Sequence, residues 1–151
     1  MNKSQGDLRI NNIIVNEQIN KNTFISYFKS YLMPYSENDN VLVFSKSYNI
    51  DDMDFWIVVG FDNGNIAYVE LENSDEKLKN SYSNWCNNKV NLKKKSHDQW
   101  LKKILGTPDE VKDNKIIYNL NWGIVTSYIE PRSGSVCITI RYRIIHKEET
   151  I

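Results

Sequence analysis

Short stretches of alternating hydrophobic and polar residues run through the chain, and this two-residue period predicts β-strands. The clearest pair, residues 54–61 and 66–71, is joined by Asn63-Gly64, two residues that tolerate the positive φ of a tight hairpin turn. Further strands are predicted over residues 8–15, 41–47, 115–121, 123–128 and 136–144.

Alternation also assigns side chains to faces in two of these strands. From Val136 to Tyr142 the even-numbered residues are all apolar, which predicts a strand with one buried face. In residues 66–71, strict alternation puts Ile66 and Val69 on opposite faces, and both faces carry apolar side chains. Tertiary context therefore decides which face of that strand is buried.

A first amphipathic helix is predicted over residues 24–32, where aromatic and aliphatic residues recur at helical spacing. Asn22 or Thr23 is placed to cap its N-terminus. Pro34 is the residue that ends it, because proline cannot continue a helix.

A second helix is predicted to begin at Ser96. Ser96 and Gln99 have the spacing of a capping box, in which each side chain bonds the backbone N–H of the other residue. Gly106 is placed to end the helix with a positive φ, and Pro108 blocks its continuation. His97 then falls in the first turn, where a surface position is expected.

The segment 73–95 is rich in Asn, Ser and Lys and is the longest expected connection, with Trp85 as its apolar anchor. The chain thus reads as a strand, a helix with three strands, this connection, and a second helix with three strands. That order predicts an α+β fold in which helices pack on one face of an antiparallel sheet, with two α-β-β-β halves as a topological hypothesis. We expect residues 1–151 to form one domain.

Composition narrows the class of protein. With 40% hydrophobic and 25% charged residues, the 151-residue chain has the make-up of a soluble globular protein. It has no apolar run of the roughly 20 residues that a membrane helix needs, and its first residues lack the apolar core of a signal peptide. We therefore expect a cytoplasmic protein without a membrane partner, in which Cys86 and Cys137 are free thiols.

Charge is unevenly distributed although the net charge is zero. Residues 1–78 contain 6 Lys and Arg against 12 Asp and Glu, and the remaining residues contain 13 against 7. Such asymmetry is typical of a charged binding face, but attraction between the two halves of one fold explains it equally well. A neutral chain without a concentrated basic surface is not expected to bind nucleic acid.

No familiar catalytic or cofactor-binding motif occurs in the sequence. It lacks a P-loop, a dinucleotide-binding glycine pattern, a nucleophile elbow and a paired-histidine zinc motif, and neither cysteine has metal-ligand spacing. We therefore expect no cofactor, no bound metal and no enzymatic activity. The alternative of an enzyme requires His97, Cys137 and a carboxylate to meet within hydrogen-bonding reach.

The C-terminal third carries a pattern that resembles a group of small bacterial proteins. The pattern comprises His97-Asp-x-Trp-Leu, Leu105-Gly-x-Pro-Asp, Tyr118, Trp122-Gly, Tyr128, Arg132-Ser-Gly and Ile138-x-Ile-x-Tyr. It resembles immunity proteins of polymorphic and contact-dependent growth inhibition toxin systems. The resemblance covers about a third of the chain and rests mostly on fold-forming residues. It implies that the chain binds and blocks one cognate toxin domain, often a nuclease, without catalytic residues of its own.

An acidic face would suit a basic nuclease, because opposite charges speed the encounter of two proteins. The candidate partner-binding residues are Trp85, Arg132 and the acidic residues Asp51, Asp52, Asp54, Glu70, Glu72, Asp75 and Glu76. Two competing hypotheses are a protein-interaction or small-ligand-binding module without catalysis, and a scaffold that pairs with a partner through an exposed sheet edge. The oligomeric state is left open by the sequence.

Overall fold

The computed structural model describes residues 1–81, Ser83 and residues 85–143. Its helices are α1 (Lys21–Phe28) and α2 (Asn87–Leu105), with short 3-10 helices η1 (Lys29–Tyr31) and η2 (Glu76–Leu78). The strands are β1 (Leu8–Ile10), β2 (Ile13–Val15), β3 (Val41–Val43), β4 (Tyr48–Ile50), β5 (Met53–Asp62), β6 (Asn65–Asn73), β7 (Glu110–Lys112), β8 (Lys115–Leu120), β9 (Gly123–Ile129) and β10 (Val136–Tyr142).

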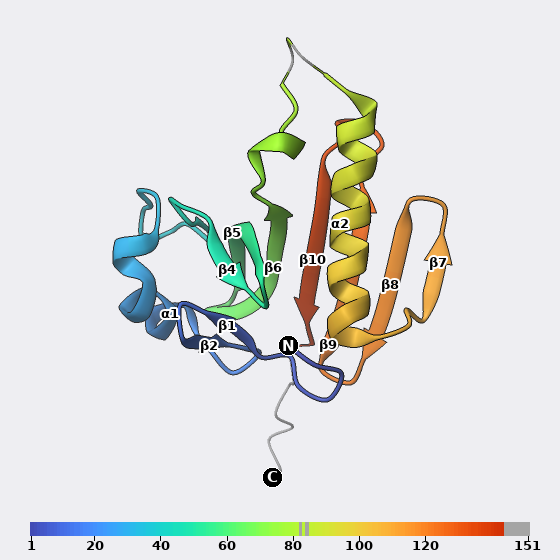
Figure 1. The fold of residues 1–151 in the computed structure, drawn as a ribbon. Helices are drawn as coiled ribbons and strands as arrows, with labels where there is room; N and C mark the ends of the chain where they lie inside the picture. Colours follow the sequence, from blue (N-terminus) through green and yellow to red (C-terminus); the bar gives the residue numbers. More distant parts are fainter. Residues whose placement is uncertain (82, 84, 144–151) are drawn as a thin grey trace.

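Eight of these strands form one antiparallel sheet, which confirms the predicted α+β class. The strand order is β3-β5-β6-β10-β9-β8-β7, and β4 pairs with β5 beside β3. The two halves of the chain, each a helix followed by strands, meet in the middle of the sheet where β6 pairs with β10 (Figure 1). Each half has one strand more than predicted, β4 in the first and β7 in the second.

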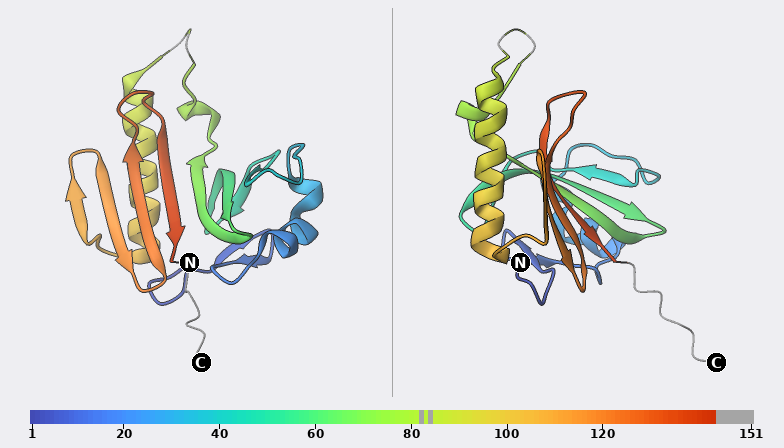
Figure 2. Two further views of the ribbon diagram at one scale, coloured as in Figure 1. Left: turned by 180° about the vertical axis from the view of Figure 1, so that it is seen from behind. Right: turned by 90° about the vertical axis from the view of Figure 1, so that its right-hand side faces the viewer.

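Both helices pack on the same face of the sheet. Phe24 of α1 contacts Phe61 with ring centroids 5.3 Å apart, and Trp100 of α2 contacts Phe55 at 4.8 Å. Phe55 and Phe61 point to the same side of β5 because they are an even number of residues apart. In the right-hand view of Figure 2, α2 runs along one side of β8, β9 and β10. The contacts of Phe55 and Phe61 place both described helices on this face of the twisted sheet, and neither packs on the opposite face. This uncovered side is called the open face below.

One extra residue in β6 decides which side chains reach the open face. Ala67 is left unpaired because its two neighbours pair with consecutive residues of β5. The bulge restarts the alternation, so Ile66 and Val69 are both buried although strict alternation separates them. It also places Glu72 directly opposite Trp56 on the open face.

The second helix is longer than the sequence predicts. It begins at Asn87 instead of Ser96, so residues 87–95 of the expected connection are helical. Ser96 is not a cap, because its hydroxyl donates to the carbonyl of Lys93 within the helix at 2.7 Å. Gly106 ends the helix as predicted, with a φ of 78°.

Polar residues on the buried side of α2 explain why the hydrophobic pattern of the sequence does not predict its first half. The buried residues of α2 each lie three or four positions from another member of the set: Val90, Lys94, His97, Trp100, Leu101 and Leu105. Lys94 is tolerated there because its ammonium bonds both carboxylate oxygens of Asp98, at 2.6 and 2.7 Å. In the described part of the chain, no helix is long and apolar enough to cross a membrane.

Paired turn residues separate strands that the sequence pattern runs together. Asn11-Asn12 has positive φ at both residues and folds the first predicted strand into the β1–β2 hairpin. Asp51-Asp52 does the same between β4 and β5. The predicted turn at Asn63-Gly64 is confirmed, with φ angles of 48° and 78°.

The predicted N-terminal cap of the first helix and the predicted end of the last strand differ from what the structure describes. The cap of α1 is Asn20, whose side chain accepts the backbone N–H of Thr23 at 2.8 Å, so neither Asn22 nor Thr23 caps this helix. The strand β10 ends at Tyr142, and the predicted last residue, Ile144, lies outside the described residues.

Candidate protein-binding site

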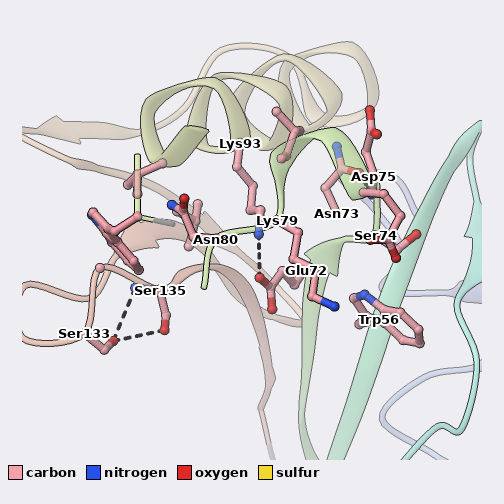
Figure 3. Close-up of a pocket in the computed structure, with 16 residues that line it drawn as sticks. Trp56, Glu72, Asn73, Ser74, Asp75, Lys79, Asn80, Lys93, Ser133 and Ser135 are labelled. Carbon is pink, nitrogen blue, oxygen red and sulfur yellow. Dashed lines mark hydrogen bonds and ion pairs between the residues drawn. The ribbon is translucent and has the colours of Figure 1, made fainter. Parts of the chain in front are cut away.

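Two adjoining hollows lie beside the end of β6. The first, named the Trp85 hollow, has a volume of about 290 Å³ and is lined by the end of β6, the η2 segment, α2 and the tip of the β9–β10 hairpin (Figure 3). The second, named the acidic hollow, lies between the β4–β5 turn and the same η2 segment. Trp56 and residues 73–76 line both hollows and form a shared wall.

Carboxylates that are scattered along the sequence converge on these hollows. Ser74, which follows β6, donates its backbone N–H to the carbonyl of Asp54 at 3.0 Å and so joins the two acidic segments. The hollows are also lined by two lysines, Lys79 and Lys93. Five of the seven predicted acidic residues line one hollow or both: Asp52, Asp54, Glu72, Asp75 and Glu76.

The other three predicted partner-binding residues, Asp51, Glu70 and Arg132, line neither hollow. The carboxylate of Asp51 lies 3.5 Å from the amino group of Met1. Glu70 is on the open face, two residues along β6 from Glu72. Arg132 is exposed at the tip of the β9–β10 hairpin, next to the Trp85 hollow in sequence but not in its lining.

An ion pair crosses the Trp85 hollow from helix to sheet. Lys93 of α2 reaches Oε1 of Glu72 with a distance of 2.7 Å (Figure 3). The Lys93 side chain is only 11% exposed, whereas the Glu72 side chain is 41% exposed. The ammonium is therefore shielded inside the hollow, and the carboxylate faces solvent at its mouth.

Trp85 packs against the tip of the β9–β10 hairpin and not in the core, although the sequence favours a core anchor. Its ring packs against Gly134, where an added Cβ would come within 2.6 Å of the ring. The indole Nε1 donates to Oδ1 of Asn87 at 2.9 Å, which fixes the orientation of the ring. Trp85 nevertheless remains 48% exposed. An indole that is oriented by its neighbours and still exposed is a common anchor in protein interfaces.

His97 of α2 forms a hydrogen bond with the shared wall. The expected surface position of His97 is wrong: the residue is fully buried, and its Nε2 accepts the backbone N–H of Asn73 at 2.9 Å. Asn73 also donates from Nδ2 to the hydroxyl of Ser96 at 3.0 Å. Burial, reinforced by the charges of Lys93 and Lys94, lowers the pKa of His97 from 6.5 to about 3. The neutral ring therefore carries its proton on Nδ1, which has no hydrogen-bond partner among the described residues.

The open face extends the site away from the hollows. One row of side chains across it follows from the strand register: Val43, Val58, Glu70, Thr139, Thr126 and Ile117. Cys137 points to the same side, because it is an even number of residues from Thr139. Burial and the charges of Glu72 and Glu70 raise the pKa of the Cys137 thiol to about 12, so it stays protonated at neutral pH.

The site contains one aromatic residue that the sequence analysis did not single out, Trp56. It is 43% exposed and lines both hollows. The alternation of β5 could have identified it in the sequence. Phe55 and Ile57, its two neighbours, are both buried, so they point to the face opposite Trp56. A tryptophan out of phase with its buried neighbours must lie on the opposite face of the strand.

The residues required by the enzymatic alternative do not come together, since His97 packs on the helix side of the sheet and Cys137 points to the open face. Within the described ranges, no group of three or more His, Cys, Asp and Glu side chains is arranged to hold a metal ion. No family model, curated protein or solved structure matches the chain.

Proposed function

We propose that this chain is an immunity protein, which binds a cognate bacterial toxin domain and blocks its active site or substrate surface. One observation carries the proposal: five acidic residues from separate segments of the chain line two adjoining hollows beside the exposed Trp56 and Trp85. The C-terminal pattern that resembles immunity proteins points to the same role.

The charge of the site favours a basic partner. Five carboxylates and two lysines line the two hollows, so their lining carries a formal charge of −3. Nuclease domains hold nucleic acid on basic surfaces, because phosphate binding depends on Lys and Arg. An acidic face accelerates the encounter with such a domain and covers the surface that would otherwise bind its substrate.

The two exposed tryptophans supply binding free energy that charged groups alone do not. Exposed carboxylates in water contribute little binding free energy on their own, because solvent screens them. Buried aromatic contacts near the centre of an interface are where most binding free energy is concentrated. Trp56 and Trp85 line the Trp85 hollow together with the acidic residues Glu72, Asp75 and Glu76, and both are available for such contacts.

The proposal predicts that a toxin-like domain is encoded next to this chain, and its test is to co-express that domain with the chain for growth rescue and to purify both for a binding titration. The site variant reverses three carboxylates that form no ion pair with another described residue: Asp54→Lys, Glu70→Lys and Glu76→Lys. Because electrostatic steering raises association rate constants by about 10- to 1000-fold, this variant should associate at least about tenfold more slowly at low salt and lose growth rescue.

The matched control reverses three exposed carboxylates away from the hollows, Glu37→Lys, Asp62→Lys and Glu110→Lys. It changes the net charge equally, so it should retain growth rescue and most of the association rate. Equal losses in the two variants would contradict the proposed face. If the unmodified chain neither binds nor rescues, the immunity function itself is wrong.

A further inference from the structure

We propose that the Trp85 hollow receives an arginine side chain of the partner protein, with its guanidinium between the Trp85 ring and the Glu72 carboxylate. This inference rests on the proposed function and specifies the chemical group that anchors the partner. It is drawn from the hollow itself: a fixed aromatic ring, a solvent-facing carboxylate and a volume that suits one long side chain.

The ring of Trp85 is held at its edge and leaves 48% of the residue exposed. The Cζ2–Cη2 edge packs on Gly134, whose positive φ of 69° and lack of a Cβ allow that close approach. The hydrogen bond from Nε1 to Asn87 helps to set the orientation of the ring. A cation placed over an indole that is already fixed gains the attraction of the ring without the cost of ordering it.

Glu72 supplies the acceptor. Within the described residues Lys93 bonds only Oε1 of Glu72, so Oε2 is available at the mouth of the hollow. Ser133 and Ser135 at the hairpin tip add hydroxyl oxygens to the lining. A guanidinium has five N–H donors in one plane and can bond a carboxylate while its face lies on an aromatic ring.

The charge around the hollow favours a cation even though Lys93 is already present. The carboxylates of Glu72, Asp75 and Glu76 line it together with Lys93 and Lys79. Lys93 is neutralised by Glu72, and the adjoining acidic hollow adds carboxylates without adding a lysine or arginine to its lining. An incoming positive charge is therefore attracted by a net negative surrounding.

The hollow is small enough to suit a single side chain. Sites for drug-sized ligands range from about 300 to 1000 Å³, and the volume of about 290 Å³ lies at the lower limit. Arginine fits the hollow better than lysine, because the compact ammonium of lysine is strongly hydrated and cannot stack on a ring. Arginine and tryptophan are also the residues most enriched among the dominant contacts of protein interfaces.

The test uses N-acetyl-arginine methylamide as the probe and follows the indole N–H of Trp85 and the amide of Gly134 by ¹⁵N NMR in the full chain. We expect saturable shifts with a millimolar dissociation constant, weaker shifts with the lysine analogue, and none with the uncharged citrulline analogue. Trp85→Ala and Glu72→Gln should each abolish the response at Gly134. Asp52→Asn removes a carboxylate that lines only the acidic hollow, so it should leave the response unchanged.

Equal shifts with the citrulline analogue, or an undiminished response in folded Trp85→Ala, would overturn the arginine assignment. With the partner domain itself, Trp85→Ala should weaken binding at least about thirtyfold, the loss typical of a dominant interface contact. If Trp85→Ala leaves partner binding intact while the reversal of Asp54, Glu70 and Glu76 abolishes it, only the arginine assignment fails. If the probe binds but no toxin domain does, the immunity function fails and the cation-binding hollow stands.

Discussion

The buried His97 makes the stability of this protein sensitive to mild acid. In the folded chain its pKa is lowered from 6.5 to about 3, because the ring is fully buried beside Lys93 and Lys94. Below pH 6.5 the unfolded chain binds a proton that the folded chain does not, so the free energy of unfolding falls as the pH falls. The stabilisation is complete above the unfolded pKa and is lost progressively down to the folded pKa.

The size of the effect follows from the interval between the two pKa values. One pH unit of unequal proton binding is worth about 1.4 kcal/mol, so lowering the pH from about 7 to about 5 should cost about 2 kcal/mol. For a chain of this length, that loss lowers the melting temperature by about 4–8 °C. Most carboxylates titrate below this window, which separates the histidine contribution from theirs.

The assay is urea unfolding between neutral pH and about pH 5, compared with His97→Gln in the same window. Glutamine does not titrate and its side-chain oxygen can accept the N–H of Asn73, so the variant should show a flat profile. The only other histidine of the sequence, His146, lies outside the described residues and is replaced by glutamine in both chains as background. Parallel pH profiles for the two chains, or an NMR titration of His97 near pH 6.5, would refute the reasoning.

Two further predictions concern stability and are measured as shifts of the urea midpoint. Asp98→Asn should cost about 3 kcal/mol, because it leaves the buried ammonium of Lys94 without its counter-charge, whereas Lys103→Gln should change stability by less than about 0.5 kcal/mol, because that lysine forms only an exposed ion pair. Gly123→Ala should cost about 3 kcal/mol, because the new Cβ would collide with the backbone of β10, while Gly64→Ala meets no neighbour and should cost about 1 kcal/mol for its positive φ alone. Reversed rankings within either pair would contradict the contacts from which these values are drawn.

Local signals in the sequence were sufficient for the elements that depend on local chemistry. The Asn63-Gly64 turn and the end of α2 at Gly106 were predictable, because positive φ selects particular residues at such positions. The start of α2 was not, because its buried side uses Lys94 and His97 where hydrophobic residues are expected. Lys94 is satisfied by Asp98 one helical turn further on, a pairing that a hydropathy average does not register, and His97 is satisfied by the backbone of β6, which is distant in sequence.

The acidic site was predictable in composition but not in geometry. Without the bulge at Ala67, the turn would set a register with Trp56 opposite Leu71, and the glutamates of β6 would point toward the core. The inserted residue moves Glu72 opposite Trp56 and so onto the open face. No alternation pattern in the sequence marks such an insertion, because Ile66 to Leu71 alternates plausibly in either register.

The pairing of β6 with β10 at the centre of the sheet has a consequence for synthesis of the chain. Most ladders of each half join strands that are close in sequence, but this one joins Leu71 to Ile138. At synthesis rates of about 5–20 residues per second, β6 waits for its partner for roughly 3–14 seconds after it is made. During that time its edge is exposed to other nascent chains, and the charges of Glu70 and Glu72 discourage pairing with the wrong strand. The carboxylates that we propose to bind a toxin domain would then also protect the unfinished protein from aggregation on the ribosome.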